Sequence, residues 1–79
     1  MDNSELLFER QEIVSLLTAA RLEKGISQQK LADMIGTKRS NISRMESGSQ
    51  NLSLDTYLKA ADALGKKVRV SLSDKAPQG

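Results

Sequence analysis

The chain has 79 residues and a net charge of +2, and it contains no cysteine, no histidine and no tryptophan. These absences exclude disulfides, thiol catalysis, zinc-finger ligation and the usual histidine general base. The charge is uneven, because residues 1–20 hold one arginine against four carboxylates whereas residues 21–48 hold six lysines and arginines against three. A basic middle region is a weak indication of an anionic partner, and a solvated surface explains it equally well.

The first apolar pattern predicts one long helix. Its apolar residues have the i, i+3, i+4, i+7 spacing of a single helical face and are Ile13, Leu16, Leu17 and Ala20. We expect the helix to begin between Ser4 and Glu9. It should end at Gly25, a residue suited to a left-handed C-terminal cap.

Two short helices follow, separated by one glycine. Ser27 can cap the first and Thr37 the second, which we expect to end near Ser47. Gly36 between them allows a sharp turn with positive φ. The apolar residues of the pair are Leu31, Ala32, Ile35, Ile42 and Met45. This frame predicts a helix-turn-helix. The alternative is a plain helical hairpin within a bundle, which leaves the broad polar face of the second helix unexplained.

A fourth helix and a strand complete the pattern. Ser53 can cap a helix that ends at Gly65, with an apolar face formed by Leu54, Tyr57, Leu58, Ala61 and Leu64. The segment 66–72 then alternates apolar and polar residues, which predicts a strand with one buried face. A lone strand leaves its backbone groups unpaired, and the simplest partner is the same strand of a second copy.

Residues 11–65 resemble the Cro/C1-type helix-turn-helix domains of phage repressors and related bacterial regulators. The resemblance rests on Ser27-Gln28, Leu31-Ala32, Gly36, Ile42-Ser43, Glu46, Gly48 and the stretch "LSLDTYLKAADALGKKVRVSL". It implies a mainly α fold of four to five helices, with one C-terminal strand that pairs across a homodimer. We therefore divide the chain into a lead-in (1–7), a DNA-binding domain (8–65), a dimerisation strand (66–72) and a disordered tail (73–79).

The resemblance also implies which residues contact DNA. In this family the third helix enters the major groove, and a residue at the start of the second helix clamps the DNA backbone. Carried over to this sequence, the clamp is Gln28, and the contacts of the third helix are Lys38, Arg39, Ser40, Asn41, Ser43 and Arg44. Asn41 can pair with adenine only if it points into the groove. For each residue alone, the alternative is an ordinary solvated side chain.

Two further sets of residues have structural roles in the family. Arg21 and Glu46 stand where these domains often place a partly buried ion pair that braces the recognition helix. The dimer would form through Val68, Val70 and Leu72. The lysines and arginine around them either contact phosphates or keep the strand edge soluble, and we favour solubility.

The predicted function is a sequence-specific DNA-binding transcriptional regulator that acts as a homodimer on a palindromic double-stranded operator. A fourth helix that runs into a short strand is similar to the HipB-like and HigA-like antitoxins, which implies repression of a toxin–antitoxin operon and a cognate toxin as partner. The alternative is a solitary repressor. We expect no enzymatic activity, cofactor or metal site, because the sequence shows no carboxylate pair, metal-ligand cluster or phosphate-binding glycine loop.

The compartment follows from two absences in the sequence. No stretch approaches the ~20 apolar residues of a membrane span, and the acidic N-terminus lacks the apolar region of a signal peptide. We therefore expect a cytoplasmic, nucleoid-associated protein.

Overall fold

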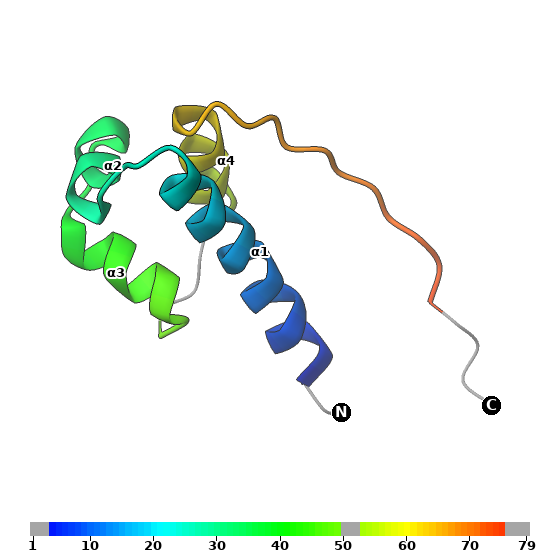
Figure 1. Cartoon of the computed structure of the whole chain (residues 1–79). Coiled ribbons are helices and arrows are strands. Elements are labelled where there is room, and N and C mark those ends of the chain that lie inside the picture. Colours follow the sequence, from blue (N-terminus) through cyan, green and yellow to red (C-terminus); the bar gives the residue numbers. More distant parts are fainter. Residues whose placement is uncertain (1–3, 50–52, 76–79) are drawn as a thin grey trace.

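The computed structural model describes residues 4–49 and 53–75, and within these ranges it contains four helices and no strand. The helices are α1 (Ser4–Glu23), α2 (Gln28–Ile35), α3 (Arg39–Ser47) and α4 (Leu54–Ala63). Both α3 and α4 pack against α1 and α2. Figure 1 shows α2 and α3 together at one end of the molecule, while the first half of α1 extends beyond the other helices.

The structure describes the predicted lead-in and tail only in part. α1 begins at Ser4, so residues 4–7 of the predicted lead-in belong to this helix. Residues 1–3 of the lead-in and 76–79 of the predicted tail lie outside the described residues.

Local capping chemistry fixes the turn between α2 and α3. The Ser27 hydroxyl accepts a hydrogen bond from the Lys30 backbone N–H at 3.0 Å and so begins α2. Gly36 ends α2 with φ of 75°, a left-handed conformation that favours glycine. The predicted cap of α3 is wrong: the N-cap is Lys38, which makes no side-chain capping bond.

The core lies where the four helices meet, and it contains four alanines among its larger aliphatic residues. Its buried members are Leu17, Ala20, Leu31, Ala32, Ile42, Met45, Ala60, Ala61 and Leu64. Small side chains let helix backbones approach closely, and three of the leucines and isoleucines are sealed from solvent. This core holds α3 through only two of its residues, Ile42 and Met45.

The buried face of α1 differs from the predicted one. Val14 is buried together with Leu17, whereas Ile13 and Leu16 are 36% and 61% exposed. The reason is that α1 turns the side carrying Val14, Leu17 and Arg21 toward the other helices. The apolar residues of α1 therefore cover a larger part of the helix surface than the core of this chain buries.

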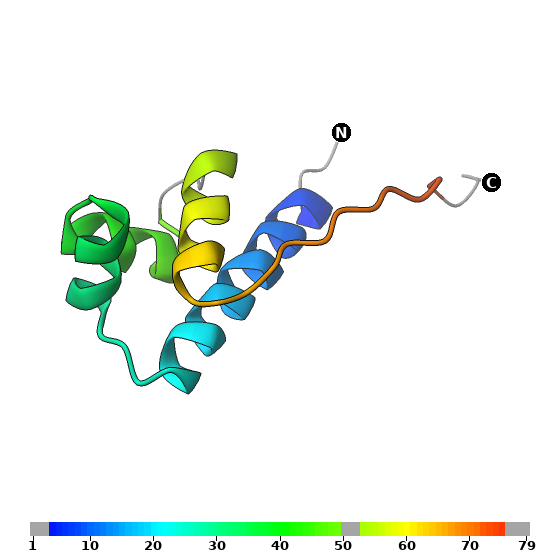
Figure 2. The ribbon, with the colours of Figure 1, turned by 90° about the horizontal axis from the view of Figure 1, so that it is seen from above.

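Residues 66–75 follow α4 as a drawn-out segment on the α1 side of the molecule (Figures 1 and 2). Val68 is partly buried and packs against the core, but Val70 is 80% exposed and Leu72 97% exposed. Within the described part of the chain, the predicted strand has no strand to pair with. Pairing between two copies remains a prediction.

Candidate nucleic-acid interface

The predicted recognition helix presents a polar surface to solvent. Ile42 and Met45 are buried, while the residues around them are exposed or partly exposed. The exposed members of the predicted set are Lys38, Arg39, Ser40 and Arg44, and the partly buried ones are Asn41 and Ser43. Ser47 was not predicted, although its i+7 spacing from Ser40 places it on the same exposed strip. Hydrogen-bond donors thus cover the side of α3 that faces away from the core.

An ion pair between α1 and α3 lies beneath this surface. Arg21 Nε donates to Glu46 Oε2 at 2.7 Å and Arg21 Nη2 to Glu46 Oε1 at 2.9 Å. Arg21 Nη1 donates to the Ile26 carbonyl oxygen at 2.7 Å, a contact that sequence alone did not predict. The side chains of the pair are only 10% and 8% exposed. The bidentate geometry therefore fixes α3 relative to α1 and to the loop before α2.

The electrostatics of this pair are consistent with its geometry. Burial acts to raise the pKa of Glu46, but hydrogen bonds from Arg21 and Gln28, together with the charge of Arg21, outweigh burial and lower it. The hydrogen bond to Glu46 raises the pKa of Arg21 above its ordinary value, against the opposing effect of burial. Both groups are held in their charged forms.

Gln28 extends the ion pair to the first residue of α3. Its Nε2 donates to Glu46 Oε1 at 2.9 Å, and its Oε1 accepts from Arg39 Nη1 at 3.3 Å. The amide nitrogen carries a second N–H, which the bond to Glu46 does not use. A continuous chain of hydrogen bonds thus runs from α1 to the predicted base-contacting surface, through Arg21, Glu46, Gln28 and Arg39.

Asn41 is placed differently from the rest of the predicted set. Its Nδ2 donates to Thr37 Oγ1 at 2.8 Å, within the turn that precedes α3. Thr37 therefore orients Asn41 instead of capping the helix. In this arrangement the Asn41 amide nitrogen is directed to its own turn, whereas pairing with adenine requires it to face the groove.

Within 4–49 and 53–75, no three histidine, cysteine or acidic side chains gather as they would around a metal ion. Among the helices of these ranges, none combines the length and the apolar character needed to cross a membrane.

Comparison with known proteins identifies the domain. A protein from Haemophilus influenzae, described as an uncharacterized HTH-type transcriptional regulator, is 36% identical over 61 residues. That match covers 77% of this chain and 62% of the relative, so the chain spans less than two thirds of the relative's length. The sequence model of the helix-turn-helix family matches residues 17–70, which include α2, α3 and α4 completely. On this match the chain belongs to the helix-turn-helix family.

Proposed function

We propose that the protein is a DNA-binding transcriptional regulator that inserts α3 into the major groove of a specific operator. The observation that carries this proposal is the donor-rich, exposed face of α3, held to the core by two apolar residues. Arginine and lysine side chains can donate to guanine O6 and N7, and serine to either kind of base pair. A buried ion pair below the face gives it a fixed orientation.

The test is a binding titration against DNA sites selected from a random library. Replacing Arg39 with alanine should weaken binding by ~1–3 kcal/mol at one base position and relax the preference there. Lys59→Ala is the control, because it removes the same charge from an exposed position on α4 outside the predicted set. If Arg39→Ala and Lys38→Ala both leave the affinity unchanged, α3 is not the reading helix. Binding should also weaken steeply with salt, because phosphate contacts release counterions.

Gln28 is proposed to contact the DNA backbone through its second amide N–H, at the N-terminus of α2 where an anion is favoured. Gln28→Ala should weaken binding to all sites by a similar factor. Because Gln28 also accepts from Arg39, the effects of Gln28→Ala and Arg39→Ala should not add. If the losses of binding free energy add strictly in the double variant, the two residues act independently.

We also propose that the protein binds DNA as a homodimer. Val70 and Leu72 are almost fully exposed, and antiparallel pairing of the segment 66–72 with a second copy would satisfy its backbone groups. A two-fold axis would set the recognition helices about one DNA turn apart, ~34–36 Å, on a palindromic operator. Truncation after Gly65 should then give a folded monomer with poor operator affinity. A truncated protein that sediments as a dimer of full strength would place the interface elsewhere.

The finer biological role that we propose is that of an antitoxin that represses its own operon and binds the toxin. The fourth helix that runs directly into the segment 66–72 supports this branch of the family over a solitary repressor. The test is co-expression with the product of the neighbouring gene: an antitoxin should relieve growth arrest and purify as a complex with it. A regulator that binds its operator but forms no such complex would be solitary. In either role we propose that it acts by binding, without catalysis, in the cytoplasm.

A further inference from the structure

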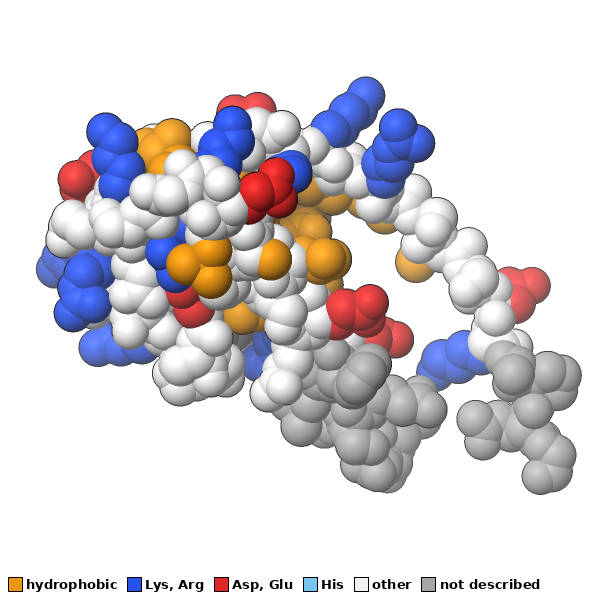
Figure 3. All heavy atoms as spheres, in the orientation of Figure 1, with side chains coloured by type: hydrophobic (Ala, Val, Ile, Leu, Met, Phe, Trp, Pro, Cys, Tyr) orange, Lys and Arg blue, Asp and Glu red, His pale blue; other side chains and the backbone are white. Residues whose placement is uncertain are grey.

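The donor-rich face of α3 also carries a carboxamide, that of Asn41, which is partly exposed. Figure 3 shows Lys and Arg side chains gathered at the end of the molecule that α2 and α3 form. Two exposed cations, Lys38 and Arg44, lie three residues before and three residues after Asn41, so they flank it on one side of the helix. Lysine and arginine only donate hydrogen bonds, whereas a carboxamide oxygen accepts them.

Thr37 determines which end of this carboxamide is free. Asn41 Nδ2 donates to Thr37 Oγ1 at 2.8 Å, and no described residue donates to Asn41 Oδ1. The nitrogen and the oxygen are bonded to the same planar carbon and point in different directions, so the oxygen points away from Thr37. The backbone of Asn41 is fixed as well, because its N–H donates to the Lys38 carbonyl oxygen at 2.9 Å. The free end of the side chain is therefore an acceptor.

A single acceptor distinguishes bases by their exocyclic groups. In the major groove, adenine N6 and cytosine N4 are amino groups that donate, whereas guanine O6 and thymine O4 accept. Two acceptors placed opposite each other without water both lose a hydrogen bond, which costs more than one formed bond contributes. Asparagine selects adenine alone when it uses its oxygen and its nitrogen together, but the Asn41 nitrogen donates to Thr37.

We propose that Asn41 reads one base of the operator through Oδ1 and selects an amino base, adenine or cytosine, over guanine and thymine on the contacted strand. Thr37 is the positioning residue that presents this oxygen to the groove. The inference rests on the proposed insertion of α3 into the major groove, and it adds the chemical group that one residue of α3 recognises.

The first step of the test finds the position in the operator. Sites are selected from a random library with the wild type and with Asn41→Ala, and one position at a time is then varied in binding titrations. The wild type should bind about fivefold more tightly when that position carries an amino base on the contacted strand, which is the effect of about one hydrogen bond. With Asn41→Ala the four bases should become equivalent at this position alone.

Base analogues then show which group is read. Purine in place of adenine lacks the 6-amino group and should bind the wild type about fivefold more weakly, with no change for Asn41→Ala. The comparison with Asn41→Ala cancels any effect of the analogue on the duplex itself. 7-Deazaadenine lacks the N7 acceptor and should bind the wild type as well as adenine does. An unchanged affinity for purine, or a loss with 7-deazaadenine, would overturn the proposal.

Thr37→Val tests the positioning role, because it removes the hydroxyl and keeps the size of the side chain. The Asn41 nitrogen is then free to meet adenine N7, so 7-deazaadenine should bind this variant more weakly than adenine does. Thr37→Ser keeps a hydroxyl and should restore the wild-type response. A loss of stability alone would lower the affinity for all sites by one factor and leave these ratios unchanged. A Thr37→Val protein that responds to both analogues as the wild type does would overturn the proposal.

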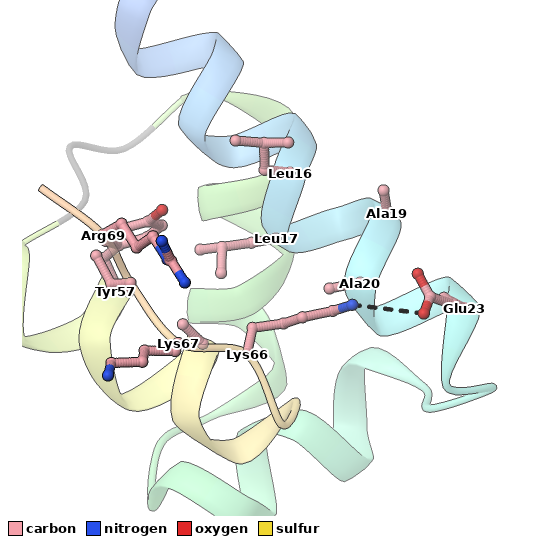
Figure 4. A pocket seen from close by; sticks show the side chains of 11 residues that line it. Leu16, Leu17, Ala19, Ala20, Glu23, Tyr57, Lys66, Lys67 and Arg69 are labelled. Atoms are coloured by element: carbon pink, nitrogen blue, oxygen red, sulfur yellow. Dashed lines mark hydrogen bonds and ion pairs between the residues drawn. The ribbon is translucent and has the colours of Figure 1, made fainter.

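Tyr57→Phe is the matched control. It also removes one hydroxyl from a partly buried side chain, but Tyr57 lines the pocket between α1 and α4 that Figure 4 shows. Its response to both analogues should equal that of the wild type.

Arg39→Ala separates this proposal from the proposed function. If Arg39→Ala relaxes the preference at its own position and Asn41→Ala changes none, α3 reads DNA and the role of Asn41 is overturned. If neither variant changes any base preference, the proposed insertion of α3 fails as well.

Discussion

The turn of α2 and α3 and the segment 66–75 are both polar and largely exposed, yet their positions are determined in opposite ways. The first is fixed by a glycine turn, a serine cap and a hydrogen-bonded chain that begins at a buried arginine. The second is attached at Val68 and by one exposed ion pair from Lys66, and its remaining apolar side chains face solvent. Exposure alone therefore does not determine whether the chain holds a region in place. In these two regions the difference lies in the buried polar partners, which the turn has and the segment lacks.

The largest expected effect is a loss of stability in the first region, the turn of α2 and α3. Glu46→Ala should lower the free energy of unfolding by ~3–5 kcal/mol, because it leaves the buried Arg21 guanidinium without its carboxylate. Urea denaturation measures it. Glu23→Ala is the control: it removes an exposed partner of Lys66, so its effect should stay below ~1 kcal/mol. Similar losses for the two variants would contradict the distinction between the regions.

Acid should weaken the same region through the same carboxylate. The folded state lowers the pKa of Glu46 below its unfolded value, so the stabilisation is complete above the unfolded pKa, near ~4.3, and is lost as the pH falls through the folded pKa. Urea denaturation measured from pH 6 to pH 3 should show that the wild type and Glu46→Gln differ less in free energy of unfolding as the pH falls through this window. A constant difference between the two proteins across the series would rule out the linkage.

A smaller effect should follow from the turn itself. Gly36→Ala forces a side chain into the left-handed region and should lower the free energy of unfolding by ~1–2 kcal/mol, although no atom lies within 4 Å of the added Cβ. Gly36→Asn should lose less, since asparagine tolerates this conformation better. Thermal denaturation distinguishes them, and an alanine variant as stable as the wild type would show that the turn is not strained.

The smallest effect should be in the second region. Replacing Val70 and Leu72 together with serine should change the free energy of unfolding of the monomer by less than ~0.5 kcal/mol, because both side chains are largely exposed. The measurement is made by dilution to a protein concentration at which only monomer remains. A loss above 1 kcal/mol would mean that these residues support their own domain.

The sequence predicted most accurately those features that depend on residues close together in the chain. The Ser27 and Ser53 caps and the helix ends at Gly36 and Gly48 are all present, and the family is confirmed. The wrong predictions include one cap and one buried face: Thr37 accepts a hydrogen bond from Asn41 instead of capping α3, and Val14 is buried on α1 where Leu16 was expected. Apolar spacing shows that a helix has a buried side, but the neighbouring helices decide which of two adjacent stripes it is.

The candidate DNA-contacting surface shows the same limit. The pairing of Arg21 with Glu46 could be expected from the family, and the structure places the two side chains together. The link from Glu46 through Gln28 to Arg39 joins residues 18 and 11 positions apart, and no local pattern predicts such contacts. The segment 66–72 is a different case, because within the described residues it has no strand to pair with, and its pairing with a second copy remains our proposal.

The weak capping of α3 has a consequence for how the protein folds. This helix has nine residues, no side-chain N-cap and only two buried side chains, and isolated helices of that length are marginal in water. Its amide hydrogens should therefore exchange with solvent through local opening of α3, faster than those of α1 near Arg21. A molecule in which α3 has opened no longer presents the face that we propose contacts DNA. The proposed DNA-contacting face should then be lost at a lower free energy than the rest of the fold.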